Sequence, residues 1–308
     1  MDLSIPFFQS ELLFYPSLSC VSSLSLTTLI SYGVYGTLDW RPIVIFTCSD
    51  FLAMGLDHYL DNAENLAQAR ATGNDGVVSV FTQARMMLIC VACILFGALL
   101  CSPIQTWAIT ALFVAPALVW NRPLFWLPIR DVANARGDDE EPAGFFKHGF
   151  VIKRIPGMKA IIIGVIRGCG TFAVVHSVLS PRLLNNESSM WTPTQLLIWS
   201  TINWICHTTM ADVRDYIDDL KEEIPTLPVL FKSVLKTKVL LTFLHAVNII
   251  SFSHNVYIVF GSLYATLLVW LLDESSPRSH FVFSMEGQPL TIALYFAVQA
   301  CKKLPAFA

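Results

Sequence analysis

Long apolar runs separated by shorter polar stretches recur along the whole chain. A helix that crosses a membrane needs about 20 mostly apolar residues, and these runs approach that length. They predict nine helices, over residues 12–32, 42–60, 84–101, 103–121, 158–179, 191–211, 235–252, 255–272 and 288–304. We therefore expect an all-α membrane protein with about nine transmembrane helices. No stretch has the composition of a linker, so residues 1–308 are expected to form a single domain.

The composition agrees with a lipid bilayer as the surroundings of the chain. Of the 308 residues 54% are hydrophobic and 14% are charged, whereas soluble domains carry about 25% charged residues. A net charge of −3 without a basic cluster argues against nucleic acid as a partner. The eight cysteines lie mostly inside apolar runs, which favours a packing role over a metal or redox site.

One set of aspartates follows the sixth apolar run. If that helix continues, Asp212, Asp215 and Asp219 lie at i, i+3 and i+7 and share one face. Carboxylates this close repel one another, and a divalent cation relieves the repulsion. Hard oxygen ligands suit Mg²⁺. A solvated acidic helix end is the alternative explanation for this set alone.

A second set closes the second apolar run. Asp50, Asp57 and Asp61 are spaced by seven and four residues, which places them on one stripe of that helix. The two helices are four apart in the chain, so both acidic ends are expected on the same side. Fifteen Lys and Arg residues fall on that side and four on the other. The positive-inside rule then predicts that the acidic face is cytosolic, and in a eukaryote we expect the endoplasmic reticulum membrane.

These motifs carry a resemblance to a known family. The pattern from Asp212 to Asp219, with Thr226-Leu227-Pro228-Val229 after it, resembles the second aspartate motif of the UbiA superfamily of intramembrane prenyltransferases. The end of that family's first motif is similar to Asp57-x-x-x-Asp61, with Arg70 as the arginine that follows. Lys153-Arg154 ahead of Gly164 resembles its basic loop. The match in order and spacing covers roughly residues 40 to 232.

The first motif departs from the family pattern Asn-Asp-x-x-Asp-x-x-x-Asp. Ala53 and Met54 stand at its first two positions, so an oxygen ligand is missing, and Asp50 lies one turn deeper. Reduced first motifs resemble those of divergent members, including the UbiA-type terpene cyclases of fungi.

The resemblance implies an apolar central cavity with a polar diphosphate site at the cytosolic face. It implies an isoprenyl diphosphate, farnesyl or geranylgeranyl, as the substrate and Mg²⁺ as the cofactor. The expected metal ligands are Asp57, Asp61, Asp212, Asp215 and Asp219. The expected phosphate contacts and catalytic cations are Arg70, Lys153, Arg154, Arg214 and Lys221, although each basic residue alone also fits a surface or lipid-headgroup role.

Three further residues lie deeper along the same helix faces. Phe46 lines up with Asp57, and Trp204 lines up with Asp212. Aromatic faces stabilise cations, so both rings are candidates for substrate binding, with plain packing as the alternative. Asp50 is a catalytic candidate because a buried carboxylate in a membrane is costly. It is expected to act as a metal ligand, a proton acceptor or the partner of Arg167.

Two outcomes share the same first step, which is ionisation of the diphosphate. The reduced first motif favours an intramolecular cyclisation, and a transfer of the isoprenyl group to an aromatic or other acceptor is the alternative. A transporter that uses intramembrane acids is a different class of function. It predicts acids near the middle of the bilayer on several helices, whereas these acids cluster at one face.

Overall fold

The computed structural model describes residues 4–118, 155–180, 190–285 and 287–303. The chain folds into helices, and no strand occurs in these ranges, which confirms the all-α prediction. The N-terminal half contains α1 (Ile5–Gln9), η1 (Ser10–Phe14), α2 (Tyr15–Tyr35), α3 (Trp40–Asp61), α4 (Ala63–Ala71), α5 (Asp75–Leu100) and α6 (Ile104–Leu118). The rest contains α7 (Met158–Val165), η5 (Ile166–Gly170), α8 (Thr171–Leu179), α9 (Pro193–Arg214), α10 (Tyr216–Lys221), α11 (Leu227–Phe231), α12 (Val234–Ser251), α13 (Val256–Leu271), η7 (Arg278–His280), α14 (Phe281–Met285) and α15 (Gly287–Lys303).

Within the described ranges, five helical segments are long and apolar enough to cross a membrane. They are Ile5–Tyr35, Trp40–Asp61, Asp75–Leu100, Met158–Leu179 and Val234–Ser251. Ile104–Leu118 and Val256–Leu271 are apolar but shorter. These helices support an integral membrane protein, while the count of nine spans stays a prediction.

Local sequence explains where several helices begin and end. Thr192 and Gln195 form a reciprocal capping box at the start of α9. The Asn74 side chain accepts a hydrogen bond from the Val77 amide at the start of α5. Gly36, with φ of 67°, ends α2 in the left-handed region that glycine tolerates.

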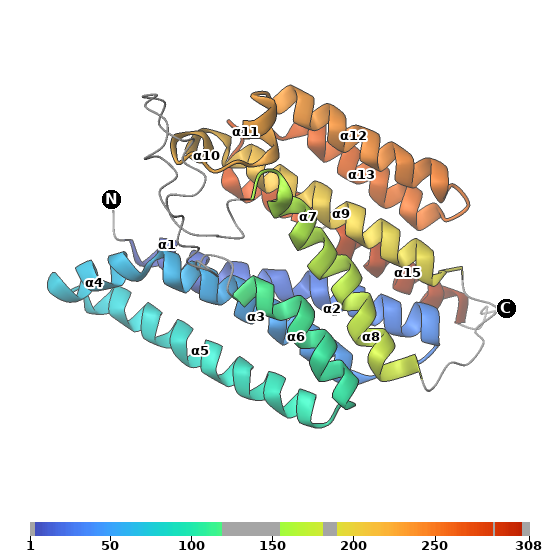
Figure 1. Cartoon of the computed structure of the whole chain (residues 1–308), viewed down its shortest axis with the longest axis horizontal. Helices are drawn as coiled ribbons and strands as arrows, with labels where there is room; N and C mark the ends of the chain where they lie inside the picture. The colour runs from blue at the N-terminus through green and yellow to red at the C-terminus, as the bar shows by residue number, and fades with distance from the viewer. Residues whose placement is uncertain (1–3, 119–154, 181–189, 286, 304–308) are drawn as a thin grey trace, which may run out of the picture.

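The two acidic helix ends lie at the same end of the molecule. α4, which follows α3, and α10, which follows α9, both lie toward the left of Figure 1, and the C-terminus lies at the right. The start of α7 is also at the left end, because the Gly157 amide donates a hydrogen bond to the Pro225 carbonyl ahead of α11. This arrangement agrees with the prediction, from the helix order, that both acidic ends lie on the same side.

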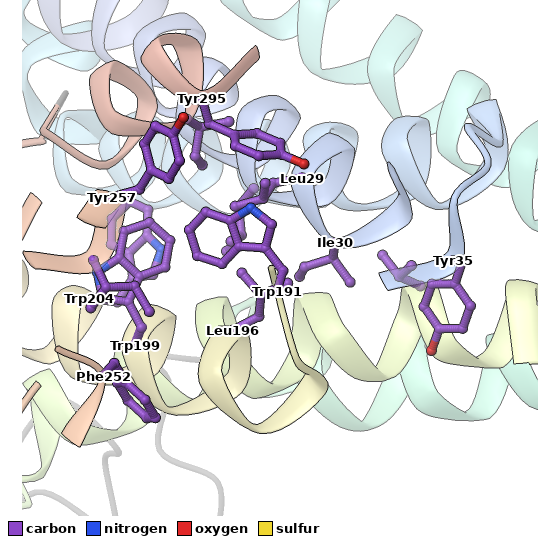
Figure 2. Close-up of a cluster of buried hydrophobic side chains, with 14 of the residues drawn as sticks. Leu29, Ile30, Tyr35, Trp191, Leu196, Trp199, Trp204, Phe252, Tyr257 and Tyr295 are labelled. Carbon is purple, nitrogen blue, oxygen red and sulfur yellow. The ribbon is translucent and has the colours of Figure 1, made fainter. Parts of the chain in front are cut away.

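An aromatic core occupies the part of the bundle away from the acidic end. Trp191 lies at its centre, with its ring centroid 5.7 Å from Trp199, 6.2 Å from Tyr257 and 5.6 Å from Tyr295 (Figure 2). The same cluster reaches Tyr35 at the end of α2 and Trp204 in the middle of α9. Packed side chains therefore fill this region, and the central cavity stays a prediction.

Two glycines, Gly164 in α7 and Gly168 in η5, let this part of the chain approach α9 closely. A Cβ atom placed on Gly168 would lie 2.6 Å from the Cα atom of Thr201, and one on Gly164 would lie 3.0 Å from the Thr201 carbonyl oxygen. Glycines four residues apart allow such backbone contact between membrane helices. This contact places Arg167, between the two glycines, against α9.

Candidate active site

A buried ion pair joins the start of α7 to the end of α9. The Lys159 ammonium donates to Asp212 Oδ1 at 2.6 Å, and the Asp212 side chain is 1% exposed. The other oxygen, Asp212 Oδ2, is buried and has no hydrogen-bond partner among the described residues. Asp215 and Asp219 lie close enough for their charges to act on both members of the pair. Lys159 therefore binds one aspartate of this set and feels the charges of the other two.

The expected continuous helix through this set is wrong. α9 ends at Arg214, and Asp215 has φ of −91° and ψ of 8° between α9 and α10. The Arg214 guanidinium donates two hydrogen bonds to the Asp215 carboxylate, at 2.7 and 2.6 Å. Asp219 turns inward and accepts a hydrogen bond from the Thr226 hydroxyl at 3.1 Å. The break changes how the three carboxylates face one another but leaves them together.

The first acidic set lies along the continuous helix α3, as predicted. Its members differ in burial, with Asp50 buried, Asp57 half-buried and Asp61 exposed at the last residue of the helix. Arg70 is exposed in the last turn of α4. The set thus runs from the interior to the surface at the acidic end of the bundle.

Asp50 is held by Arg167, one of the three roles expected for it. Arg167 donates to both Asp50 oxygens, with Nε 3.1 Å from Oδ1. Ser23 also donates to Asp50, and Ser19 accepts from Arg167. The Arg167 guanidinium carbon lies over the Trp204 ring, 3.8 Å from its centroid. Four helical segments, α2, α3, η5 and α9, therefore meet in one buried charged network.

The remaining predicted residues occupy different places. Phe46 is 1% exposed and packs in a separate apolar cluster with Ile45, Ala98 and Val174. Lys221 is exposed and pairs with Asp218 at 3.0 Å. Lys153 and Arg154 lie outside the described residues. The roles assigned to these four residues stay predictions.

The second acidic set fits a divalent cation. The buried Asp212 Oδ2 atom accepts no hydrogen bond from the described residues and so has a lone pair available for a cation. Carboxylate oxygens are also the ligands that Mg²⁺ prefers. Among the described residues, no three His, Cys, Asp or Glu side chains converge to hold a metal ion by themselves. Mg²⁺ commonly uses one or two carboxylates and completes its shell with phosphate and water, so this set fits a metal that binds together with a phosphate group.

Sequence reasoning missed two residues at this end of the bundle. Lys159 is absent from the expected site residues, although a lysine inside an apolar run is costly unless it has a partner. Glu11, which stands just before the first predicted helix, is buried near His58. The sequence shows Glu11 as a lone acid at the edge of an apolar run, but it does not show which residue lies beside Glu11 in the fold.

No protein-family model and no curated protein matches the sequence. Solved structures do match its fold. A UbiA homologue from Aeropyrum pernix K1 in the apo form is 12% identical, with a TM-score of 0.54, over 92% of this chain and 98% of that chain. A UbiA homologue from Archaeoglobus fulgidus bound to GPP and Mg²⁺ is 13% identical, with a TM-score of 0.54, over 95% of this chain and 99% of that chain. A UbiA homologue from Archaeoglobus fulgidus bound to Cd²⁺ is 15% identical, with a TM-score of 0.54, over 95% of this chain and 99% of that chain. The chain therefore has the fold of the UbiA homologues, as its aspartate motifs implied.

Proposed function

We propose that this protein is a membrane enzyme that uses Mg²⁺ to ionise an isoprenyl diphosphate and then cyclises the isoprenyl group within the bilayer. The observation that carries the proposal is the buried Asp212 carboxylate, with Lys159 on one oxygen and the other oxygen unpartnered among the described residues. The fold supports it, since the Archaeoglobus fulgidus homologue was solved with GPP and Mg²⁺ and, separately, with DMAPP and Mg²⁺.

The two acidic sets would share the metal. Asp212, Asp215 and Asp219 would hold Mg²⁺ on the α9 side, and Asp57 and Asp61 on the α3 side. The bound metal would neutralise the charge that develops on the leaving diphosphate. Lys159 and Arg214 already lie against the carboxylates, so their ammonium and guanidinium groups are placed to contact phosphate oxygens beside the metal. Arg70, Lys153, Arg154 and Lys221 remain further candidates for that contact.

The buried network would form the inner boundary of the reaction site. Both oxygens of Asp50 are engaged by Arg167 and Ser23, so we assign Asp50 to positioning Arg167 rather than to metal binding. Arg167 in turn fixes the Trp204 ring. A ring held in one orientation can present its remaining face to a carbocation, and Phe46 is the second proposed wall residue.

Supplying the substrate without an acceptor tests the proposal. Membranes or purified protein are incubated with geranyl, farnesyl or geranylgeranyl diphosphate and Mg²⁺, and the products are extracted and identified. Cyclic hydrocarbons or alcohols formed from one substrate support the cyclase. Release of diphosphate only when an aromatic acceptor is added would replace the cyclase by a prenyltransferase, and no Mg²⁺-dependent release under either condition would overturn both.

Substitutions connect this activity to the site. Most turnover should be lost in each of four single variants, Asp57→Ala, Asp61→Ala, Asp215→Ala and Asp219→Ala. When two of these substitutions are combined, the loss of turnover should be smaller than the sum of the two single losses. Asp218→Ala is the matched control, because its side chain is 77% exposed. Near-native turnover in two of the four variants at saturating Mg²⁺ would contradict the shared metal site.

A further inference from the structure

The N-terminal helix brings a buried carboxylate to the acidic end of the bundle. Glu11 is 6% exposed although it lies in an otherwise apolar segment. A buried carboxylate costs several kcal/mol unless charged or hydrogen-bonding groups compensate it. Such a group is therefore expected to have a specific partner.

Glu11 contacts a residue next to the first acidic set, and its charge acts on a residue next to the second. Its Oε2 atom lies 3.0 Å from His58 Nδ1, and His58 is the neighbour of Asp57 on α3. On the other side its charge acts on Arg214, which holds Asp215 at the end of α9. The first and second acidic sets are thus linked through one side chain that belongs to neither.

Apolar packing holds this carboxylate in place. Phe8 and Leu12, on either side of Glu11 in the chain, pack with Phe81 of α5 in one buried cluster. The ring centroids of Phe8 and Phe81 are 5.4 Å apart. Between Phe8 and Leu12 the helix passes from α1 into the π-helical turn η1. A π turn inserts one residue and changes the direction of the side chains around it, so Phe8 and Leu12 stay on the cluster while Glu11 points to His58.

We propose that Glu11 is a positioning residue. Its carboxylate holds His58 beside Asp57 on α3, and its negative charge stabilises the Arg214 guanidinium that binds Asp215 at the end of α9, so that both acidic sets keep their places around a diphosphate. The inference rests on the proposed function. It predicts that removing the charge of Glu11 weakens diphosphate binding through Arg214, without removing any group that itself contacts the substrate.

Glu11→Gln tests this with little change in size. We expect the KM for the isoprenyl diphosphate to rise about tenfold while kcat changes much less. In an Arg214→Gln background the same change should have little further effect, because residues that act as a unit are not additive. Glu64→Gln is the matched control, since Glu64 is an exposed acid in the first turn of the neighbouring helix α4. Glu11→Asp, which keeps the charge, should recover part of the affinity.

A binding measurement separates this inference from the proposed function. The thermal unfolding of detergent-purified protein is followed with and without Mg²⁺ and inorganic diphosphate. A wild type that gains no stability from this pair contradicts the proposed function itself. If the wild type gains stability and Glu11→Gln gains just as much, only the role of Glu11 is overturned. The same holds if the effects of Glu11→Gln and Arg214→Gln on KM are fully additive. If Glu11→Gln does not accumulate, His58→Gln removes the same contact from α3 and is judged by the same outcomes.

Discussion

The guanidinium carbon of Arg167 lies over the ring of Trp204, 3.8 Å from its centroid, while the same guanidinium binds Asp50. Both charges are nearly out of contact with solvent, with side-chain exposures of 9% for Arg167 and 10% for Asp50. Removing one member of such a pair leaves the other charge buried and uncompensated.

Arg167→Met should therefore lower the free energy of unfolding by about 3–5 kcal/mol, the usual cost of breaking a buried pair. The double variant Arg167→Met/Asp50→Asn should regain a large part of that loss, because no unpaired charge remains. Thermal or denaturant unfolding of the purified variants measures both. A double variant no more stable than Arg167→Met would show that the pair is not the source of the loss.

The Lys159–Asp212 pair should matter for turnover more than an exposed lysine of the same bundle. In Lys159→Met the buried Asp212 carboxylate loses the one hydrogen-bond partner that it has among the described residues, and a cation next to the proposed diphosphate site is removed. We expect a loss of at least about tenfold in kcat/KM. Lys236→Met provides the control, because Lys236 is an exposed lysine in the first turn of α12 and belongs to neither proposed set of site residues. Equal effects of the two substitutions on kcat/KM would contradict a special role for Lys159.

Gly168→Ala should be poorly tolerated because its Cβ atom would lie 2.6 Å from the Cα atom of Thr201 and 2.7 Å from its amide nitrogen. These are backbone atoms, so η5 and α9 would have to separate, at a cost of about 1–3 kcal/mol. Gly97→Ala on α5 is the control, since nothing lies within 4 Å of the added atom, and alanine is the better helix former. Unfolding temperatures of the two variants in detergent decide the matter. If Gly168→Ala is as stable as Gly97→Ala, the close crossing is not required.

The two ends of the bundle should face opposite sides of the membrane. In sealed vesicles with the cytosolic side outward, an impermeant thiol reagent should label Lys221→Cys at once and Leu38→Cys only after permeabilisation. Leu38 is 61% exposed between α2 and α3, at the end away from the acidic residues. The background must lack the exposed native cysteines Cys90, Cys93, Cys101 and Cys301. Labelling of both positions from the same side would contradict the predicted topology.

Sequence reasoning recovered the helical fold and the sites of the acidic ends because both depend on local patterns. Apolar runs and the stripe of Asp50, Asp57 and Asp61 can be read from periodicity alone. For Asp50 the sequence left three roles open, and pairing with Arg167, a second charge inside an apolar run, was one of them.

The pairings at the acidic end were not predictable in the same way. Lys159 reaches Asp212 across a separation of 53 residues, and Glu11 reaches His58 from another helix. Both contacts depend on how each helix is rotated about its own axis, which is set by packing such as that of Phe8 and Leu12. The break at Asp215 had no signal either, because no Pro or Gly stands between Asp212 and Asp219.

Two π-helical turns, η1 and η5, carry the buried ionic residues Glu11 and Arg167. A π turn holds one residue more than the α-helical turn it replaces. Deleting one residue there would restore a regular helix on both sides, so the rest of the helix would keep its rotational phase while the ionic side chain lost its place. The same deletion elsewhere in the helix would rotate every later residue by about 100°. Among related chains, a length difference of one residue at either turn would therefore mark a gain or loss of the buried charge, with the surrounding bundle left intact.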